Sequence, residues 1–176
     1  MSSCSSWGDN LIYFNREAKM SRIKTILYFT PEVFPDIEEI KDPTTAAFYS
    51  AATNKIKLIG GFKYLKLDTS MPFEEIDIDI IREFCKNNNA EAAIIPKVKY
   101  FKVGFGKYVF SNQVIVSLKL YNANGDYIME TAYDTYKANG RMLGSAENSV
   151  ILGTEGALEK MTKELKNREK QLRKAS

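Results

Sequence analysis

The chain has 176 residues, of which 44% are hydrophobic and 27% are charged, and these values are typical of one globular domain with flanking segments. Its net charge of +3 argues against a dedicated nucleic-acid binder, because phosphate recognition usually requires a clustered basic surface. No histidine is present, so Ser-His and Cys-His nucleophile systems are excluded, and we expect no enzyme, cofactor, metal site or small-molecule substrate.

Residues 1–21 show no sustained hydrophobic period and are predicted to be a tether, which can hold a short edge strand at residues 11–14. The tether begins with serines on both sides of Cys4, and this pattern resembles the end of a bacterial lipoprotein signal. The resemblance implies that Cys4 is the lipid-attachment site and that the protein is periplasmic, anchored to the bacterial outer membrane. The alternative is an ordinary initiator methionine followed by a serine-rich tail, in a cytoplasmic protein.

Two strands and a helix are predicted in the first part of a domain that covers residues 22–165. The β-branched and aromatic residues 23–29 favour a strand. Asp42 followed by Pro43 is typical of a helix start, and we expect this helix to run to about residue 58. Residues 62–67 alternate between apolar and basic side chains, which predicts a half-buried strand.

A second helix is predicted at residues 75–88, because four apolar side chains recur there at helical spacing. They are Ile76, Ile80, Ile81 and Phe84. Cys85 falls on the same apolar side and is expected to be a buried free thiol. Residues 87–89 are asparagines, which tolerate the left-handed geometry at the end of a helix.

Three consecutive strands are predicted at residues 92–103, 108–122 and 127–137. The last two are joined through Asn124-Gly125, the strongest short hairpin signal. The side chains of these strands alternate between apolar and polar, so one face of the sheet should be covered and the other should be polar with tyrosines.

The chain ends in a predicted helix that starts near Ser145 and has an apolar stripe up to residue 165. Gly153 and Gly156 each weaken it by about 1 kcal/mol relative to alanine, which indicates a close approach of helix to sheet. Residues 166–176 are predicted to be a frayed basic tail. The resulting fold class is α+β, in the order β-α-β-α-β-β-β-α, with one mixed sheet and helices packed mainly on one face. The first three strands should be parallel neighbours, because helices connect them.

Two segments resemble a group of bacterial envelope lipoproteins with a core like the anticodon-binding-domain fold. Residues 89–95 (NAEAAII) are similar to the group's start of a long strand, with Asn89 and Glu91 in place of its glycine and aspartate. Residues 118–128 (LKLYNANGDYI) look like its following hairpin. The group includes the curli-secretion-pore lipoprotein, PelC, peptidoglycan-synthase activator lipoproteins and the amino-terminal domain of TolB. The resemblance implies a non-enzymatic structural or assembly component of a cell-envelope complex.

Basic and aromatic side chains gather on the predicted strands and are typical of protein-binding surfaces. The expected partner-binding face consists of Lys97, Lys99, Phe101, Lys119, Tyr127 and Tyr133. We expect protein partners, with self-association as one option, and no nucleic acid. Two alternatives stay open: a soluble module that stacks single-stranded nucleic acid on this face, and plain cross-strand packing of the aromatic rings.

Overall fold

The computed structural model describes residues 8–20, 22–59, 63–103, 109–137 and 145–175. Within these residues the chain forms β1 (Asp9–Phe14), β2 (Thr25–Thr30), β3 (Glu32–Phe34), α1 (Glu38–Ile59), β4 (Lys63–Ser70), α2 (Ile78–Asn88), β5 (Ala92–Val103), β6 (Val109–Asn122), β7 (Tyr127–Asp134) and α3 (Ala146–Ala175). The predicted α+β class is confirmed, and β1 and β3 are added to the predicted order of elements.

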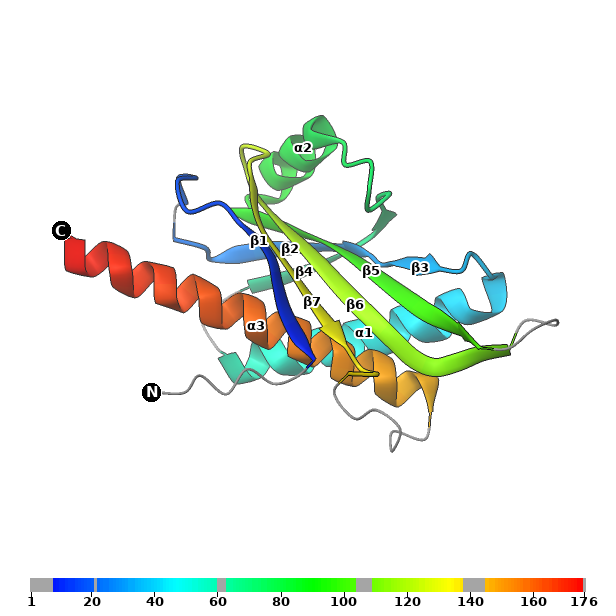
Figure 1. The fold of residues 1–176 in the computed structure, drawn as a ribbon. Coiled ribbons are helices and arrows are strands. Elements are labelled where there is room, and N and C mark those ends of the chain that lie inside the picture. The colour runs from blue at the N-terminus through cyan, green and yellow to red at the C-terminus, as the bar shows by residue number, and fades with distance from the viewer. Residues whose placement is uncertain (1–7, 21, 60–62, 104–108, 138–144, 176) are drawn as a thin grey trace, which may run out of the picture.

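All the strands belong to one mixed sheet in the order β1-β7-β6-β5-β2-β4, with β3 beside β5 (Figure 1). Strand β2 pairs in parallel with β4 and with β5, as the helical connections predicted. Strands β5, β6 and β7 form an antiparallel meander, and β1 closes one edge of the sheet by antiparallel pairing with β7. Two long antiparallel strands therefore form the centre of the sheet.

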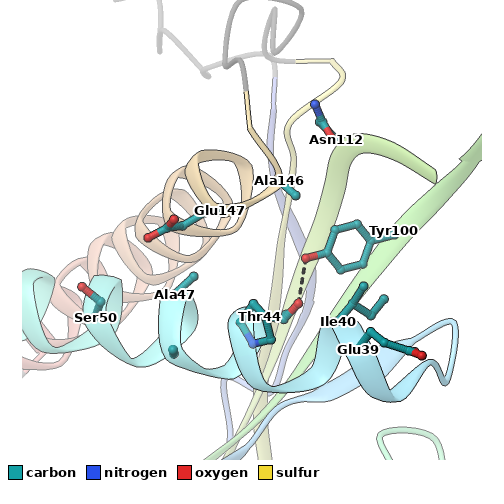
Figure 2. A pocket seen from close by; sticks show the side chains of 11 residues that line it. Glu39, Ile40, Thr44, Ala47, Ser50, Tyr100, Asn112, Ala146 and Glu147 are labelled. Carbon is teal, nitrogen blue, oxygen red and sulfur yellow. Dashed lines mark hydrogen bonds between the residues drawn. The ribbon is translucent and has the colours of Figure 1, made fainter. Parts of the chain in front are cut away.

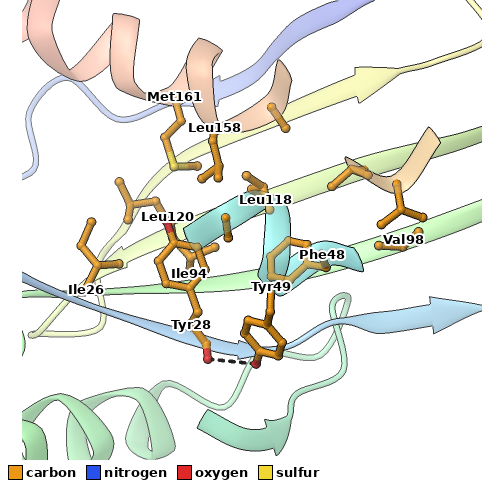
Figure 3. Close-up of a cluster of buried hydrophobic side chains, with 14 of the residues drawn as sticks. Ile26, Tyr28, Phe48, Tyr49, Ile94, Val98, Leu118, Leu120, Leu158 and Met161 are labelled. Atoms are coloured by element: carbon orange, nitrogen blue, oxygen red, sulfur yellow. Dashed lines mark hydrogen bonds between the residues drawn. The ribbon is translucent and has the colours of Figure 1, made fainter. Parts of the chain in front are cut away.

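Helices α1 and α3 lie together on one face of the sheet, whereas α2 lies on the opposite face (Figure 1). The larger hydrophobic core fills the space between the sheet and helices α1 and α3, and Figure 3 shows part of it, including Tyr28, Phe48, Leu118 and Met161. A smaller core under α2 includes Phe29, Ile81 and Cys85. The helices are thus packed mainly on one face, and the second face is covered in part.

The end of helix α2 and the hairpin after β6 show the local signals that the sequence predicted, whereas α2 begins at Ile78, three residues later than predicted. The Asp77 carboxylate accepts hydrogen bonds from the backbone N–H groups of Asp79 and Ile80 and caps the start of α2. Asn89 closes the helix with a left-handed φ of 49°. In the hairpin Gly125 has a φ of +82°, which a residue with a β-carbon rarely adopts.

The first helix starts five residues earlier than the sequence predicted. It begins at Glu38. The acidic side chains of Glu38 and Glu39 in its first turn interact favourably with the positive end of the helix dipole and stabilise this start. Pro43 therefore lies inside the helix instead of at its first position. Its ring removes the N–H that would donate to the Glu39 carbonyl, so the helix lacks one internal hydrogen bond near its start.

Both ends of the chain contribute more regular structure than the sequence predicted. After β1, the backbone N–H of Asn15 donates to the Ile128 carbonyl at 2.8 Å. Helix α3 continues through Ala175, so the predicted frayed tail is helical. The guanidinium of Arg168 in this helix donates hydrogen bonds to the backbone carbonyls of Asn15, Arg16 and Ala18. These bonds connect the last helix to the segment that follows β1.

Candidate functional site

Pairing of β3 with β5 determines how the predicted partner-binding face is built. Glu32 is the register partner of Lys97, and Phe34 is the register partner of Lys99. Partners in adjacent strands point to the same side of a sheet, so these side chains meet on the face that carries α2. The Lys97 Nζ lies 3.1 Å from the Glu32 Oε1, and the Lys99 Nζ lies 5.9 Å from the centroid of the Phe34 ring.

Lys97 and Lys119 bind partners within the molecule, and these contacts hold the segment before α2 against the sheet. The Lys119 ammonium donates to the Phe73 carbonyl at 2.6 Å and lies 4.2 Å from the centroid of the Phe73 ring. The Phe73 N–H donates to the Glu32 carboxylate at 2.7 Å. Glu74 lies 3.3 Å from the Lys97 Nζ. The backbone N–H and C=O of Phe73 are therefore both hydrogen-bonded to charged side chains of the sheet. We call the group of Glu32, Phe73, Glu74, Lys97 and Lys119 the Phe73 clasp.

The electrostatics of the Phe73 clasp hold Lys97 in its charged form. Burial by itself would lower the pKa of the Lys97 ammonium, because a low-dielectric environment disfavours charge. Hydrogen bonds to Glu32 and Glu74 act in the opposite direction, and the net result is a pKa above the ordinary value for lysine. Lys97 is therefore charged at neutral pH.

An open patch remains beyond the clasp, and it is made of Phe34, Lys99, Phe101 and Tyr136. Phe34 is 50% exposed and Tyr136 is 55% exposed. The rings of Phe101 and Tyr136 lie 6.3 Å apart between centroids. Large exposed aromatic side chains beside a lysine are typical of protein interfaces. We call these four residues the aromatic–lysine patch.

Phe34 and Tyr136 were missing from the predicted face. Phe34 lies between two prolines, in a segment expected to be a loop, and only its pairing with β5 places it beside Lys99. Tyr136 follows the end of β7, and its contact with Phe101 joins residues 35 apart in the chain, which no local pattern predicts.

Tyr127 belongs to a stack of three tyrosine rings at another place on the same face. Its ring centroid lies 4.4 Å from that of Tyr13 and 5.1 Å from that of Tyr121. The Tyr127 hydroxyl donates to the Glu130 carboxylate. Burial raises the pKa of Tyr127, and the Glu130 charge raises it further. Tyr13 is 40% exposed, so this stack ends at the surface.

Tyr133 lies on the opposite side of the sheet and is not brought together with the other predicted face residues. A β-carbon placed on Gly156 of α3 would come within 2.1 Å of the Tyr133 ring, so this ring lies directly under the helix. Tyr100 also points to the helix side, where its hydroxyl lies 2.7 Å from that of Thr44 and only 7% of the residue is exposed. The described aromatic side chains of the strands are therefore divided between two faces and do not form one stacking platform.

The second notable surface is a pocket between the first half of α1, the start of α3 and the neighbouring strands (Figure 2). Its volume is about 570 Å³. Apolar side chains such as Ile40 and Ala47 form part of its wall, and the hydrogen bond between Thr44 and Tyr100 lies within it. Glu39 of α1 and Glu147 of α3 also line it.

The sequence also predicts a role or a state for each of the two cysteines. Cys4, the predicted lipid-attachment site, lies outside the described residues. Cys85 is a buried free thiol, as the sequence predicted. Within the described ranges, no group of three or more acidic or cysteine side chains is placed to hold a metal ion. In the same part of the chain, no helix is long and apolar enough to cross a membrane.

The fold and its surfaces define a mixed α/β domain whose sheet is covered by helices mainly on one face. Some solved protein structures have a similar fold. PelC from Paraburkholderia phytofirmans, solved as a dodecamer, has a TM-score of 0.53 and 10% identity and covers 85% of this chain and 93% of its own. A variant of that dodecamer gives a TM-score of 0.53 and 9% identity over 85% and 95% of the two chains. Lipoprotein GNA1162 from Neisseria meningitidis has a TM-score of 0.41 and 9% identity over 64% and 85%.

The likeness to PelC is a likeness of fold. The predicted resemblance to PelC is confirmed at this level, because the alignment covers most of both chains. No protein-family model matches the sequence, and no curated protein matches it either.

Proposed function

We propose that this protein is a non-enzymatic component of a bacterial cell-envelope assembly that acts through protein–protein contacts, including contacts with copies of itself. In this proposal, lipid on Cys4 anchors it to the periplasmic side of the outer membrane. The fold shared with PelC, an envelope protein solved as a dodecamer, is the observation that carries the proposal.

Three features of the chain support this function. The sheet presents the aromatic–lysine patch, in which Lys99 and Phe101 were expected to bind a partner. The lysines of the Phe73 clasp are engaged within the molecule, so they are not free to bind a partner beside the patch. Residues around Cys4 match the pattern after which bacterial lipoproteins are acylated.

The anchoring part is tested on the native protein expressed in a bacterial host. Membrane fractionation followed by mass spectrometry of the N-terminal peptide should find an acylated Cys4 in the outer-membrane fraction. The Cys4→Ser variant is the control, and it should appear in the periplasmic fraction without lipid. An unmodified Cys4 in protein that remains in the cytoplasm would remove the anchoring claim.

The partner-binding part is tested by crosslinking in cells. The double variant Lys99→Glu, Tyr136→Ser changes two exposed patch residues and should reduce crosslinked complexes, whereas Lys86→Glu on the exposed side of α2 should not. Both variants should unfold at the same temperature as the parent. Equal crosslinking of all three proteins would show that the patch does not contact a partner.

A further inference from the structure

We infer that copies of this protein associate head to tail, with the basic C-terminal end of α3 from one copy seated in the acidic-rimmed pocket between α1 and α3 of the next. This inference rests on the self-association included in the proposed function. It names the two surfaces that meet and the chemistry that joins them.

The pocket has the composition of a peptide-binding groove with a preference for positive charge. Its apolar wall includes Ile40, Ala46 and Ala146, which can receive the aliphatic stems of lysine side chains. Glu39 of α1 and Glu147 of α3 both line the pocket and are exposed, so each of the two helices contributes one negative side chain to its rim. Asp42 adds a third exposed carboxylate on α1.

The end of α3 has the complementary chemistry. Residues 166–176 contain five basic residues and one acidic residue, a net charge of +4. Lys166, Lys170 and Lys174 are exposed and recur every four residues, so they follow one side of the helix. After Arg168, each residue of α3 whose exposure is described is exposed. This end of the helix extends away from the sheet (Figure 1).

The two surfaces are placed so that they cannot meet within one molecule. Ala146 and Glu147 at the start of α3 line the pocket, whereas the basic stripe lies at the other end of this 30-residue helix. A helix of that length spans about 45 Å, so the stripe can reach only the pocket of another copy. Such a contact joins two different surfaces, and repeating it produces a closed ring or a filament.

Charge reversal with rescue tests the inference on the full chain carrying Cys4→Ser. The pocket variant has Glu39→Lys and Glu147→Lys, and the tail variant has Lys170→Glu and Lys174→Glu. Sedimentation velocity at several concentrations measures self-association. Each variant alone should associate about tenfold more weakly than the parent, because like charges then face one another. An equimolar mixture of the two variants, and a single chain with all four changes, should regain association.

Two controls separate this contact from general effects of charge and folding. Glu75→Lys with Glu83→Lys makes the same change of net charge at exposed positions away from both surfaces and should associate like the parent. Ala46→Arg adds bulk and positive charge at an exposed position inside the pocket and should weaken association without unfolding the domain.

The outcomes distinguish failure of this inference from failure of the proposed function. A parent that self-associates while both variants associate equally well places the contact elsewhere and overturns the inference alone. Weakening without rescue in the mixture and in the fourfold variant also overturns it. A parent that is monomeric at every concentration overturns both the inference and the proposed self-association.

Discussion

Gly156 of α3 lies directly against the ring of Tyr133 in β7, and a β-carbon at residue 156 would come within 2.1 Å of the Tyr133 Cδ2. One turn earlier, a β-carbon on Gly153 would come within 2.6 Å of the Val116 Cγ2. The two glycines therefore let the helix backbone approach the sheet more closely than any larger residue would. This contact positions the long helix that we propose carries the self-association surface.

Replacing Gly156 with alanine should destabilise the protein, although alanine is the better helix former. The added methyl group must displace the Tyr133 ring, and overpacking of this kind costs about 1–3 kcal/mol, which outweighs the gain of about 1 kcal/mol in helix propensity. Urea denaturation measures the change. Asn167→Ala, at an exposed position of the same helix, should be neutral or slightly stabilising. Equal stability of Gly156→Ala and the parent would contradict the close contact.

Most of the fold could be predicted from the sequence, because its signals are local. Alternation of apolar and polar side chains predicted the long strands, Asn124-Gly125 predicted the hairpin, and Asn89 predicted the end of α2. Strands β1 and β3 were harder, since β1 was expected only as a short edge strand inside a tether, and β3 has three residues beside proline. Such strands are stabilised mainly by their neighbours in the sheet, which no local pattern records.

The candidate site was predicted less completely, because it depends on which side of the sheet each side chain occupies. Lys99 and Phe101 do lie on the open side, but Tyr133 lies on the other side under α3. A register shift between Leu120 and Tyr121 changes the alternation across β6 and β7 and could not be read from the sequence. The pocket was missed entirely, since its wall comes from elements more than 100 residues apart.

Removing the Glu32 carboxylate should loosen the segment before α2. Glu32 accepts from the Phe73 N–H and pairs with Lys97, so Glu32→Ala leaves the Phe73 N–H without its acceptor and removes one of the two carboxylates that pair with the Lys97 ammonium. We expect a loss of about 2–3 kcal/mol in the free energy of unfolding. Hydrogen exchange of the Phe73 amide should also become faster. Asp36→Ala, which removes an exposed carboxylate from a surface ion pair, should change neither quantity appreciably.

Glu91 should make stability depend on acid pH. Its carboxylate accepts from the Thr25 N–H at 2.7 Å and the Lys24 N–H at 3.0 Å, and the Thr25 bond is the main reason why the pKa of Glu91 is lowered below its ordinary value of 4.5. Stabilisation by a group with a lowered pKa is present above the unfolded pKa and is lost as the pH falls through the folded pKa. The parent should therefore lose stability below about pH 4.5 more steeply than Glu91→Gln. Parallel pH profiles of the two proteins would contradict this role.

Cys85 should resist thiol reagents until the domain opens. The side chain lies on the inner side of α2 and is buried, and burial raises the pKa of its thiol to about 11, so little of the reactive thiolate exists at neutral pH. In the full chain with Cys4→Ser, labelling by an aromatic disulfide should be slow in the native state and rapid in denaturant. The neighbouring Ile81 is fully buried in the same cluster, and Ile81→Ala should remove about 2–5 kcal/mol of stability and accelerate native-state labelling accordingly. Fast labelling of the parent without denaturant would show that α2 does not seal this side of the sheet.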